Sequence, residues 1–518
     1  SYMVSMLNAN RILYIIALAG VVLAGIMVRF SNLGAESGWH DYDEGVHLSA
    51  SLLLSKGYTP YIDFFFAHPP LSLHVLEFVV GDGGPQAYAR ARAISAMLGS
   101  ATLIVLAAAA YMSVGKLAAL IGTAFLALDG FASYNSRMVM LEPYVDFFLS
   151  VSVLSYVLLR KCRTPTQEAI LSATSGLALG LSLSSKMSGL FGAGAILLHA
   201  IVSRRIRVST LIFSSAIITY LLISSKYILA EPDTYLKQTI LFHIVRPSDG
   251  IAQTERLRWM LTSILDLGVT WAGFPSLFLA LLMAPSLVRS KLVSNDIYLW
   301  TMWSLSYIIA FSLTKTFFGH YIQHIITPLS YVIGVAVELG SRLRLVPWKT
   351  SITHVFLTKI TPIWILSMAL IQAGIISVYN PPATRDDTPV RVSQLLIEMG
   401  VSHSSVIAFE PIYTFLSREY PSNMVIDSYG YMMYEGMGLE SYSFFEAILK
   451  YFSGELYSSW PIHEQKVQEK IVRDILDSNY IIIDWRARWQ LTSASLHTVY
   501  QHTTCIAKIR NIEICSVS

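Results

Sequence analysis

Long apolar segments restrict the fold of this chain more than any other feature of its sequence. A helix that crosses the hydrocarbon core of a bilayer needs about 20 apolar residues, and such segments recur through residue 379. They lie at 12–30, 93–113, 117–134, 144–160, 169–185, 187–203, 208–229, 268–288, 296–314, 321–340 and 361–379. Backbone polar groups inside a bilayer have to bond within their own segment, so each segment is predicted to be a helix. The sequence therefore predicts a multi-span α-helical membrane protein with about eleven spans.

Composition agrees with this class and excludes two others. Hydrophobic residues make up 54% of the 518 residues, charged residues make up 14%, and the mean hydropathy is +0.52. An ordinary soluble domain has about 25% charged residues. A net charge of +3, scattered over loops, is too small for a nucleic-acid-binding protein. Membrane lipid is the expected partner, and nucleic acid is not.

Charge in the short loops predicts the topology. With a cytoplasmic N-terminus, the basic loops "RKCR" (160–163), "RRIR" (204–207) and "RLRLVPWK" (342–349) all fall on the cytoplasmic side, as the positive-inside rule requires. The same count places the loop 31–92 and everything after residue 379 outside. We expect an integral protein of a prokaryotic plasma membrane, with the first span, which carries no cleavable signal, kept as an anchor.

The external loop is predicted to hold two helices on the membrane surface. Val46, Ala50 and Leu53 recur at helical spacing with His47 between them, which is typical of an amphipathic helix in the interface. A second helix is expected to begin at the "HPPL" segment, because proline favours the first helical turn.

The amino-acid composition changes after residue 379, where charged residues become more frequent. We predict a transmembrane catalytic domain at 1–379 and a soluble external α/β domain at 380–518. The predicted strands are "SSVIAFEP", "NMVIDSYG", "NYIIIDW" and the arms of a C-terminal hairpin, and the predicted helices are "VRVSQLLIEMG", "IYTFLSREY" and "HEQKVQEKIVRDILDS". Cys505 and Cys515 flank the hairpin turn, which leaves open a cross-strand disulfide or two buried thiols.

Ionisable side chains gather at the external ends of several predicted spans. Asp41, Asp43 and Glu44 follow the first span; taken alone, a solvated loop with helix caps explains them, and the functional alternative is a general base with a raised pKa. The other members on this face are Arg137, Glu142, Lys186, Lys315, His320, Tyr321 and His324. A lysine between two spans is costly unless it reaches an anion or extends to the headgroups. Acids that activate a nucleophile and cations that hold a phosphate thus meet at one membrane face.

These segments resemble the GT-C glycosyltransferases of the protein O-mannosyltransferase and aminoarabinose transferase type. "DYDEGVHLSASLLLSKG…PYIDFFFAHPPLSLHV" resembles their first external loop, which carries an Asp-Glu pair followed by "HPPL". "SRMVMLEPYVDFF", "GLALGLSLSSKMSGLF" and "HYIQHIITPL" are similar to their Arg-x-x-x-Leu-acid segment, their Gly-rich span ending in Lys-x-x-Gly-Leu, and their His-Tyr-rich entry to a late span. The resemblance covers the membrane half through about residue 340.

The resemblance implies a GT-C fold and a glycosyltransferase, like the dolichyl-phosphate-mannose-protein mannosyltransferases. It implies transfer of a monosaccharide from a polyprenyl-phosphate donor to an external acceptor, with inversion at the anomeric carbon. Asp43 is implied as the catalytic base, with Glu44 beside it and Glu142 as the second acidic position. The expected donor-phosphate contacts are Arg137, Lys186, Lys315 and His320, and the expected substrate-positioning residues are Asp41, His68, Tyr321 and His324.

Features in which this sequence differs from the family indicate the class of acceptor and bear on the alternative functions. Protein O-mannosyltransferases carry a β-trefoil domain in an external loop, and the loop at 230–258 is too short for one. A glycolipid or lipid-linked glycan acceptor is therefore favoured over a protein. An oligosaccharyltransferase-type subunit is the first alternative, but its Trp-Trp-Asp motif is missing from the C-terminal region. A secondary transporter is the second, but its charges should lie near the bilayer midplane.

No cofactor is expected. The "DYDEGVH" segment with His320 and His324 offers oxygen and nitrogen ligands for a divalent metal ion. Polar groups that hydrogen-bond around a wet cavity explain the same residues without a metal, and this interpretation is preferred.

Overall fold

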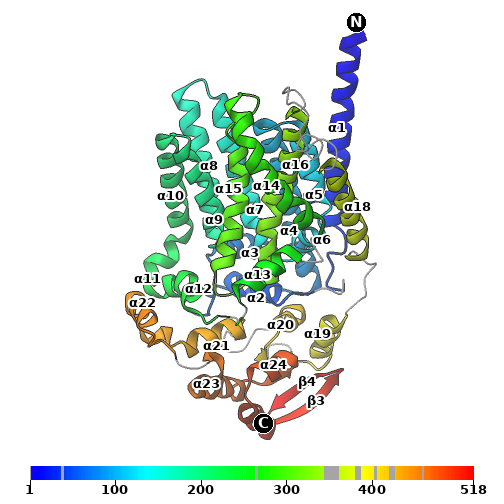
Figure 1. Ribbon diagram of the computed structural model, residues 1–518. Helices are drawn as coiled ribbons and strands as arrows, with labels where there is room; N and C mark the ends of the chain where they lie inside the picture. The colour runs from blue at the N-terminus through cyan, green and yellow to red at the C-terminus, as the bar shows by residue number, and fades with distance from the viewer. Residues whose placement is uncertain are drawn as a thin grey trace.

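Helices dominate the computed structural model, which describes residues 2–36, 40–248, 250, 252–262, 267–343, 361–379, 387–401, 405–418, 426–457 and 460–518. Long helices form a bundle, and the C-terminal part of the chain covers one end of it (Figure 1). The bundle helices are α1 (Tyr2–Arg29), α4 (Pro85–Ser113), α5 (Lys116–Ala127), α6 (Gly130–Ser136), α7 (Glu142–Leu158), α8 (Pro165–Ser185), α9 (Gly189–Val202), α10 (Ile206–Ala230), α14 (Leu267–Arg289), α15 (Ile297–Leu313), α16 (Gln323–Leu343) and α18 (Thr361–Tyr379).

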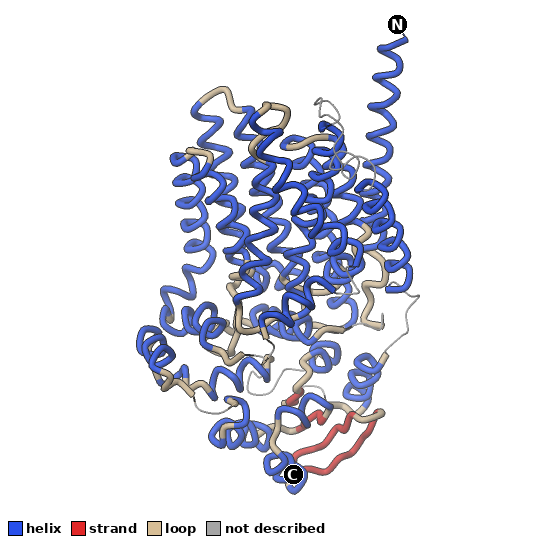
Figure 2. The backbone as a smooth tube through the Cα atoms, viewed as in Figure 1, coloured by secondary structure: helices blue, strands red, loops and turns tan. Residues whose placement is uncertain are grey.

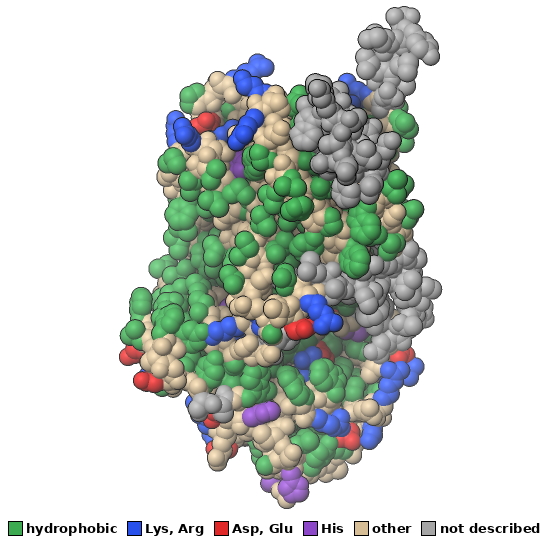
Figure 3. All heavy atoms as spheres, in the orientation of Figure 1, with side chains coloured by type: hydrophobic (Ala, Val, Ile, Leu, Met, Phe, Trp, Pro, Cys, Tyr) green, Lys and Arg blue, Asp and Glu red, His purple; other side chains and the backbone are tan. Residues whose placement is uncertain are grey.

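A helix underlies each of the eleven predicted apolar segments, and α5 and α6, bent by 67°, share one of them. Within the described ranges, six helices are long and apolar enough to cross a membrane, or seven if the bent pair counts as one span. Helices α9 and α15 are apolar but shorter. The predicted class of multi-span helical membrane protein is confirmed, whereas the number of crossings and their direction stay predictions. Hydrophobic side chains cover much of the visible side of the bundle (Figure 3).

Small residues bring α8 and α10 close together. A Cβ atom added at Gly176 would lie 2.3 Å from the Ile212 carbonyl oxygen, and one added at Gly180 would lie 2.6 Å from that of Ala216. Glycines four residues apart let two membrane helices approach backbone to backbone, where van der Waals contact holds them without any help from water. This packing fixes the axis of α8, whose end carries Lys186.

The external loop forms the two predicted helices, α2 (Tyr42–Ser55) and α3 (Leu71–Val80). That α2 lies at the membrane surface stays a prediction, but its polar face is not exposed to water. All its residues from Glu44 to Leu54 are buried, because α20 (Ile412–Ser417) of the C-terminal part packs on it. Gly45 permits this contact, since a Cβ there would lie 2.8 Å from the backbone nitrogen of Ile412.

The C-terminal part combines helices with a small sheet (Figure 2). Besides α20, its elements are α19 (Thr388–Glu398), β1 (Val406–Ala408), α21 (Ser428–Gly436), α22 (Phe444–Ser453), α23 (Gln465–Leu476), β2 (Tyr480–Ile483), α24 (Trp485–Gln490), α25 (Ser493–Gln501), β3 (Thr503–Ile509) and β4 (Ile512–Val517). The strand order is β1-β2-β4-β3, with β1 and β2 parallel and the other pairs antiparallel. The segment at 380–386 lies outside the described residues, so the domain boundary at 379/380 stays a prediction.

Most of the predicted C-terminal elements are present. The strand predicted at "NMVIDSYG" is wrong where it can be compared: residues 423–425 lie outside the described ranges, and Ser428 begins α21, with the Asp427 side chain accepting a hydrogen bond from Gly430 N as its cap. The C-terminal hairpin is confirmed. Cys505 and Cys515 face each other in its register and form a disulfide bond, which settles the alternative left open above.

Short helices connect the bundle to the C-terminal part. The chain leaves α10 through α11 (Pro232–Leu236), the π-helical turn η2 (Lys237–Leu241) and α12 (Phe242–Val245). Asp233 accepts a hydrogen bond from the backbone nitrogen of Phe444 and pairs with Lys237, which donates to the Tyr442 carbonyl. These polar contacts fix the start of α22 against the end of a membrane helix.

Candidate functional site

A cavity of about 500 Å³ lies between the bundle and the C-terminal part. Six sequence-predicted site residues line it, and they are Asp41, Asp43, His68, Lys186, His320 and Tyr321. A larger cavity, of about 590 Å³, lies at the opposite end of the bundle and holds none of them. The chemistry-bearing residues thus converge on the smaller cavity.

The start of α2 places two carboxylates in this cavity. Asp41 is the N-cap: its side chain accepts a hydrogen bond of 2.9 Å from Asp43 N, and Glu44 completes a capping box by accepting from Asp41 N. Burial raises the pKa of Asp41 to about 7, and Asp43 is the largest like charge beside it. Burial likewise raises the pKa of Asp43 to about 6, with Asp427 and Glu142 adding to the shift and Lys186 opposing it.

Glu44 turns away from the cavity. Its carboxylate forms a bidentate ion pair with Arg92, at 2.8 and 2.7 Å, and accepts further hydrogen bonds from Tyr88 Oη and Val139 N. Although burial alone would raise the pKa of Glu44, the Arg92 guanidinium holds it below its ordinary value. With every oxygen occupied, Glu44 anchors α2 rather than reacting, so the structure does not support the catalytic role predicted for it.

A second polar group reaches the cavity from the bundle. Lys186 Nζ lies 2.5 Å from Glu142 Oε1 and 4.6 Å from the centre of the Tyr321 ring. His320 Nε2 lies 3.7 Å from Asp43 Oδ2 and 3.8 Å from Glu142 Oε1. Glu142 lies behind Lys186, and its second oxygen has no hydrogen-bond partner among the described residues. The predicted residues Asp43, Glu142, Lys186 and His320 therefore form one connected cluster.

An apolar groove of about 390 Å³ opens from the polar cavity. The two share five lining residues, which are His68, Lys186, His243, Arg246 and Tyr321. The groove continues past Leu190, Phe191 and Ile244, and Lys315 lies on it with Nζ 4.1 Å from the Tyr451 ring centre. A polar chamber joined to an apolar channel, with cations at the junction, suits a molecule that has a charged head and a hydrocarbon tail.

The C-terminal part supplies one wall of the polar cavity. The residues of this wall were not predicted from the sequence. Asp427, Tyr429, Arg486 and Trp489 line it together with Tyr42 of α2. Tyr42 Oη donates to Asp427 Oδ1 at 2.9 Å, and the Arg486 guanidinium lies 4.0 Å from the centre of the Tyr42 ring. Trp489 and Tyr429 stack at 5.5 Å between ring centres, and stacked aromatic rings commonly form sugar platforms. Local sequence gave no signal for these residues, because only tertiary packing brings them to the site.

Four predicted site residues lie outside both cavities: Glu44 and Glu142, described above, and Arg137 and His324. Arg137 points toward the end of α1, where Nη1 donates to Ser31 Oγ at 3.4 Å, and Arg246 occupies the junction instead. His324 is buried in the bundle, where Nδ1 lies 2.8 Å from Asp146 Oδ1 and Nε2 lies 3.0 Å from Ser188 Oγ. Both are corrections to the predicted site, and in both cases a neighbour on the same segment lines the cavity: Asn135 for Arg137, and Tyr321 for His324.

Among the described residues, no group of three or more His, Cys, Asp or Glu side chains has the geometry to hold a metal ion. The expectation that the protein works without a metal stays a prediction.

Comparison with known proteins places this site in a family context. Residues 56–234 match the family described as dolichyl-phosphate-mannose-protein mannosyltransferase. Over 241 residues the chain is 27% identical to the undecaprenyl phosphate-alpha-4-amino-4-deoxy-L-arabinose arabinosyl transferase of Yersinia enterocolitica, a match that covers 45% of this chain and only 42% of that relative.

Solved structures extend the match over the whole chain. ArnT from Cupriavidus metallidurans, bound to undecaprenyl phosphate, aligns with a TM-score of 0.65 at 12% identity, covering 97% of this chain and 98% of that one. The chain has a GT-C glycosyltransferase fold. The oligosaccharyltransferase of Archaeoglobus fulgidus also aligns, with a TM-score of 0.56 at 10% identity over 91% of this chain and 69% of that one.

The solved structures confirm the predicted GT-C architecture. The family match and the Yersinia relative agree with the resemblance to the protein O-mannosyltransferase and aminoarabinose transferase type. The predicted enzyme class, a polyprenyl-phosphate-sugar glycosyltransferase, agrees with these relatives. The secondary transporter and the oligosaccharyltransferase-type subunit are not favoured, since the family match and the Yersinia relative are both sugar transferases of another type.

Proposed function

We propose that this protein transfers a monosaccharide from a polyprenyl-phosphate donor to a hydroxyl or phosphate-linked acceptor at the outer membrane face. The observation that carries the proposal is the junction of the two cavities. The polar cavity and the apolar groove share Lys186 and Arg246, so one amphiphilic donor can place its sugar, its phosphate and its isoprenoid chain in adjoining spaces.

The donor phosphate is proposed to bind at this junction. Lys186 and Arg246 supply positive charge there, and charge-assisted bonds to a phosphate are about twice as strong as neutral ones. Glu142 holds Lys186 in place through their 2.5 Å ion pair. The isoprenoid chain then follows the groove past exposed Ile244 and Leu313, which open toward the hydrocarbon of the bilayer.

Asp43 is proposed as the general base. Its side chain is 32% exposed to the cavity and lies 3.7 Å from His320, and its raised pKa suits proton transfer near neutral pH. The acceptor oxygen loses its proton to Asp43 and bonds to the anomeric carbon, while the bond from that carbon to the phosphate oxygen breaks. Polyprenyl phosphate leaves with the bonding electrons. A single displacement of this kind inverts the anomeric carbon.

The C-terminal part is proposed to hold the acceptor. Arg486, Tyr429 and Trp489 face Asp43 from outside the membrane, where a guanidinium suits an anionic group and stacked aromatic rings suit a sugar face. This arrangement fits a glycolipid or a lipid-linked glycan better than an extended peptide. The proposal includes a prokaryotic plasma membrane, a cytoplasmic N-terminus and no metal, since side-chain cations already face the leaving phosphate.

A donor screen tests the function. Purified protein is incubated with a panel of undecaprenyl-phosphate monosaccharides, aminoarabinose among them, with lipid acceptors extracted from bacterial membranes. Release of undecaprenyl phosphate with one sugar, dependent on acceptor, supports the proposal. If no sugar in the panel is released, while the protein binds undecaprenyl phosphate no better than a single-chain alcohol, the proposal is wrong.

A further inference from the structure

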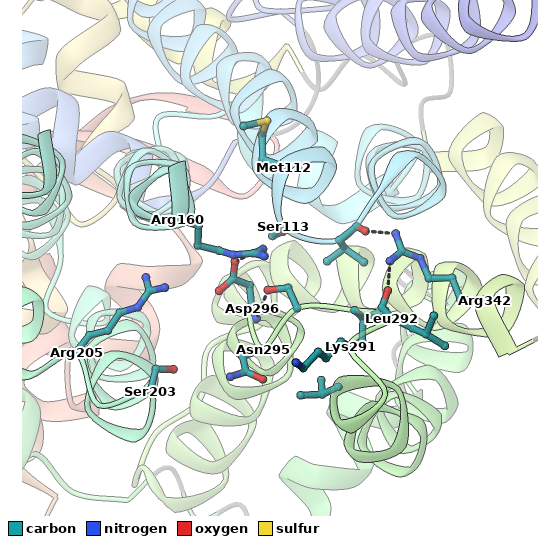
Figure 4. Close-up of a pocket in the computed structure, with 14 residues that line it drawn as sticks. Met112, Ser113, Arg160, Ser203, Arg205, Lys291, Leu292, Asn295, Asp296 and Arg342 are labelled. Atoms are coloured by element: carbon teal, nitrogen blue, oxygen red, sulfur yellow. Dashed lines mark hydrogen bonds and ion pairs between the residues drawn. The ribbon is translucent and has the colours of Figure 1, made fainter. Parts of the chain in front are cut away.

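The larger cavity at the opposite end of the bundle is lined by cations that the proposed reaction does not use. Figure 4 shows it, and its charged side chains are Arg160, Arg205, Lys291, Asp296 and Arg342. They come from the ends of α7 and α16 and from the α9–α10 and α14–α15 connections, which form the basic loops of the sequence. Four cations face one carboxylate.

Two of these cations are held by other groups of the protein, and they fix the edge of the cavity. Arg160 Nη1 pairs with Asp296 Oδ2 at 3.0 Å. Arg342 donates to the carbonyls of Leu292 and Val114 at 2.6 and 2.7 Å. The Asn295 carbonyl is bonded to His199 Nε2 at 3.1 Å, so the α14–α15 connection is fixed from both sides.

The other two cations, Arg205 and Lys291, make no ion pair and no side-chain hydrogen bond within the part of the chain that the structure describes. In Figure 4 they extend toward the cavity from different sides, with Asn295 between them. The positive-inside rule explains why the loops are basic. It does not explain why side chains from separate loops converge on one preformed cavity with two of them unpaired.

We propose that this cavity binds a phosphate group from the inner membrane face. Arg205 and Lys291 would supply the charge, and Ser203 and Asn295 would supply neutral hydrogen bonds. Basic pockets between membrane helices on the cytoplasmic side commonly bind anionic headgroups. The phosphate comes either from an anionic phospholipid or from a soluble phosphate ester, and the two sources share this recognition chemistry.

A charge-matched pair of variants tests the site. Arg205→Gln with Lys291→Gln removes the two unpaired cations, and Arg163→Gln with Arg207→Gln removes the same charge from the same face outside the cavity. Native mass spectrometry compares how much phosphatidylglycerol and phosphatidylethanolamine the protein retains, which tests the phospholipid. The shift in melting temperature with added glycerol phosphate tests the soluble phosphate ester. We expect the first variant alone to weaken binding in one of these arms, about thirtyfold if each of the two charges contributes about 1 kcal/mol. Equal weakening in both variants, or binding in neither arm, would overturn the proposal.

A second inference comes from the apolar face of α22. Phe445, Leu449 and Phe452 are 75%, 69% and 79% exposed, at the spacing of one helical face, while Ala447 on the other face is buried. In water such a face is unfavourable, at about 25 cal/mol per Å² of apolar surface. Contact with the hydrocarbon of the bilayer would remove this apolar face from water.

The lipid-facing surface of α10 continues onto α22. Leu229, at the end of α10, is 83% exposed, and the Phe444 to Asp233 hydrogen bond joins the start of α22 to the helix that follows α10. Figure 3 shows hydrophobic side chains over the lower end of α10 and over α11 and α22 without a break. We infer that α22 inserts this face into the outer leaflet and attaches the C-terminal part to the bilayer.

Depth-dependent quenching tests this attachment. Phe445→Cys and, as the control, Glu469→Cys on α23 are made with Cys162→Ser, and each is labelled with an environment-sensitive dye. In vesicles containing lipids with nitroxide on the acyl chain, we expect the dye at position 445 to be quenched several-fold more strongly than the dye at 469. Equal quenching at both positions would show that α22 faces water.

Discussion

Tyr42 donates a 2.9 Å hydrogen bond to Asp427 across 385 residues of chain. The donor lies in the first turn of α2, beside the proposed base, and the acceptor caps α21 in the C-terminal part. Both groups are partly buried, so losing one partner weakens the hydrogen bonding of the other. This bond therefore couples the position of Asp43 to the folding of the external region.

Tyr42→Phe and Asp427→Ala should each destabilise the protein by about 1 to 3 kcal/mol. The double variant should lose less than the sum, because the bond between Tyr42 and Asp427 can be lost only once. Thermal unfolding in detergent gives the three values, and single-turnover transfer shows whether Asp43 is displaced. Strict additivity would mean that the two side chains act independently.

Asp43→Asn should reduce transfer by roughly a hundred- to ten-thousand-fold, since the amide keeps the shape of the side chain but accepts no proton. Donor affinity, measured by binding of undecaprenyl phosphate, should stay within a few-fold of the parent. Asp41→Asn should be milder, because asparagine also caps helices. A fully active Asp43→Asn enzyme beside an inactive Asp41→Asn enzyme would assign the base to Asp41.

The rate of transfer should fall as the pH drops through about 6, because burial raises the pKa of Asp43 to that value and only the deprotonated form accepts a proton. In Asp427→Asn the negative charge that helps to raise the pKa of Asp43 is gone, which lowers that pKa. The acid limb of the kcat/KM profile should then move to lower pH. A shift to higher pH, or none, contradicts the pairing of these carboxylates.

Arg246→Met should weaken donor binding by about tenfold or more, because Arg246 is proposed to face the phosphate. Arg137→Met serves as the control, since Arg137 lies outside both cavities and contacts Ser31. Replacing Lys186 alone would leave Glu142 buried and unpaired, so Lys186→Met is best combined with Glu142→Gln. Equal losses in the Arg246 and Arg137 variants would restore the phosphate role predicted for Arg137.

Native cysteines offer a test of the topology. Cys162 is a free, partly exposed thiol in a basic loop, whereas Cys505 and Cys515 are joined in the C-terminal hairpin. A membrane-impermeant maleimide should label Cys162 only from the cytoplasmic side. After mild reduction, it should label the hairpin cysteines from the outside. Labelling of both from one side would contradict the predicted orientation.

The sequence predicted the bundle well because apolar length is a local property. Each predicted span contains a helix, and the "DYDEG" and "HPPL" segments lie where the resemblance placed them. The roles of Glu44 and His324 could not be predicted in the same way. Whether a carboxylate meets a cavity or a guanidinium depends on the partner, and Arg92 and Asp146 reach them only through packing between helices.

The acceptor side of the site was beyond sequence reasoning for a related reason. Arg486 follows a buried strand and looks like an ordinary surface charge until α24 carries it over the Tyr42 ring. At "DSYG", β-favouring residues suggested a strand, but Asp427 caps a helix there and thereby also meets Tyr42. A tertiary hydrogen bond of this kind cannot be recognised from the periodicity of either segment.

Asp427, Arg486 and Trp489, which form one wall of the polar cavity, are synthesised after the membrane bundle. The cavity is therefore complete only when the C-terminal part has been made. The ribosome completes the whole bundle, with Asp43 and Lys186, well before it reaches these residues. A chain that stops or fails to export its last hundred or so residues holds the membrane half of the site without its outer wall. Because transfer is proposed to take place in this cavity, a chain that lacks these residues would leave Asp43 and Lys186 in a cavity open on one side.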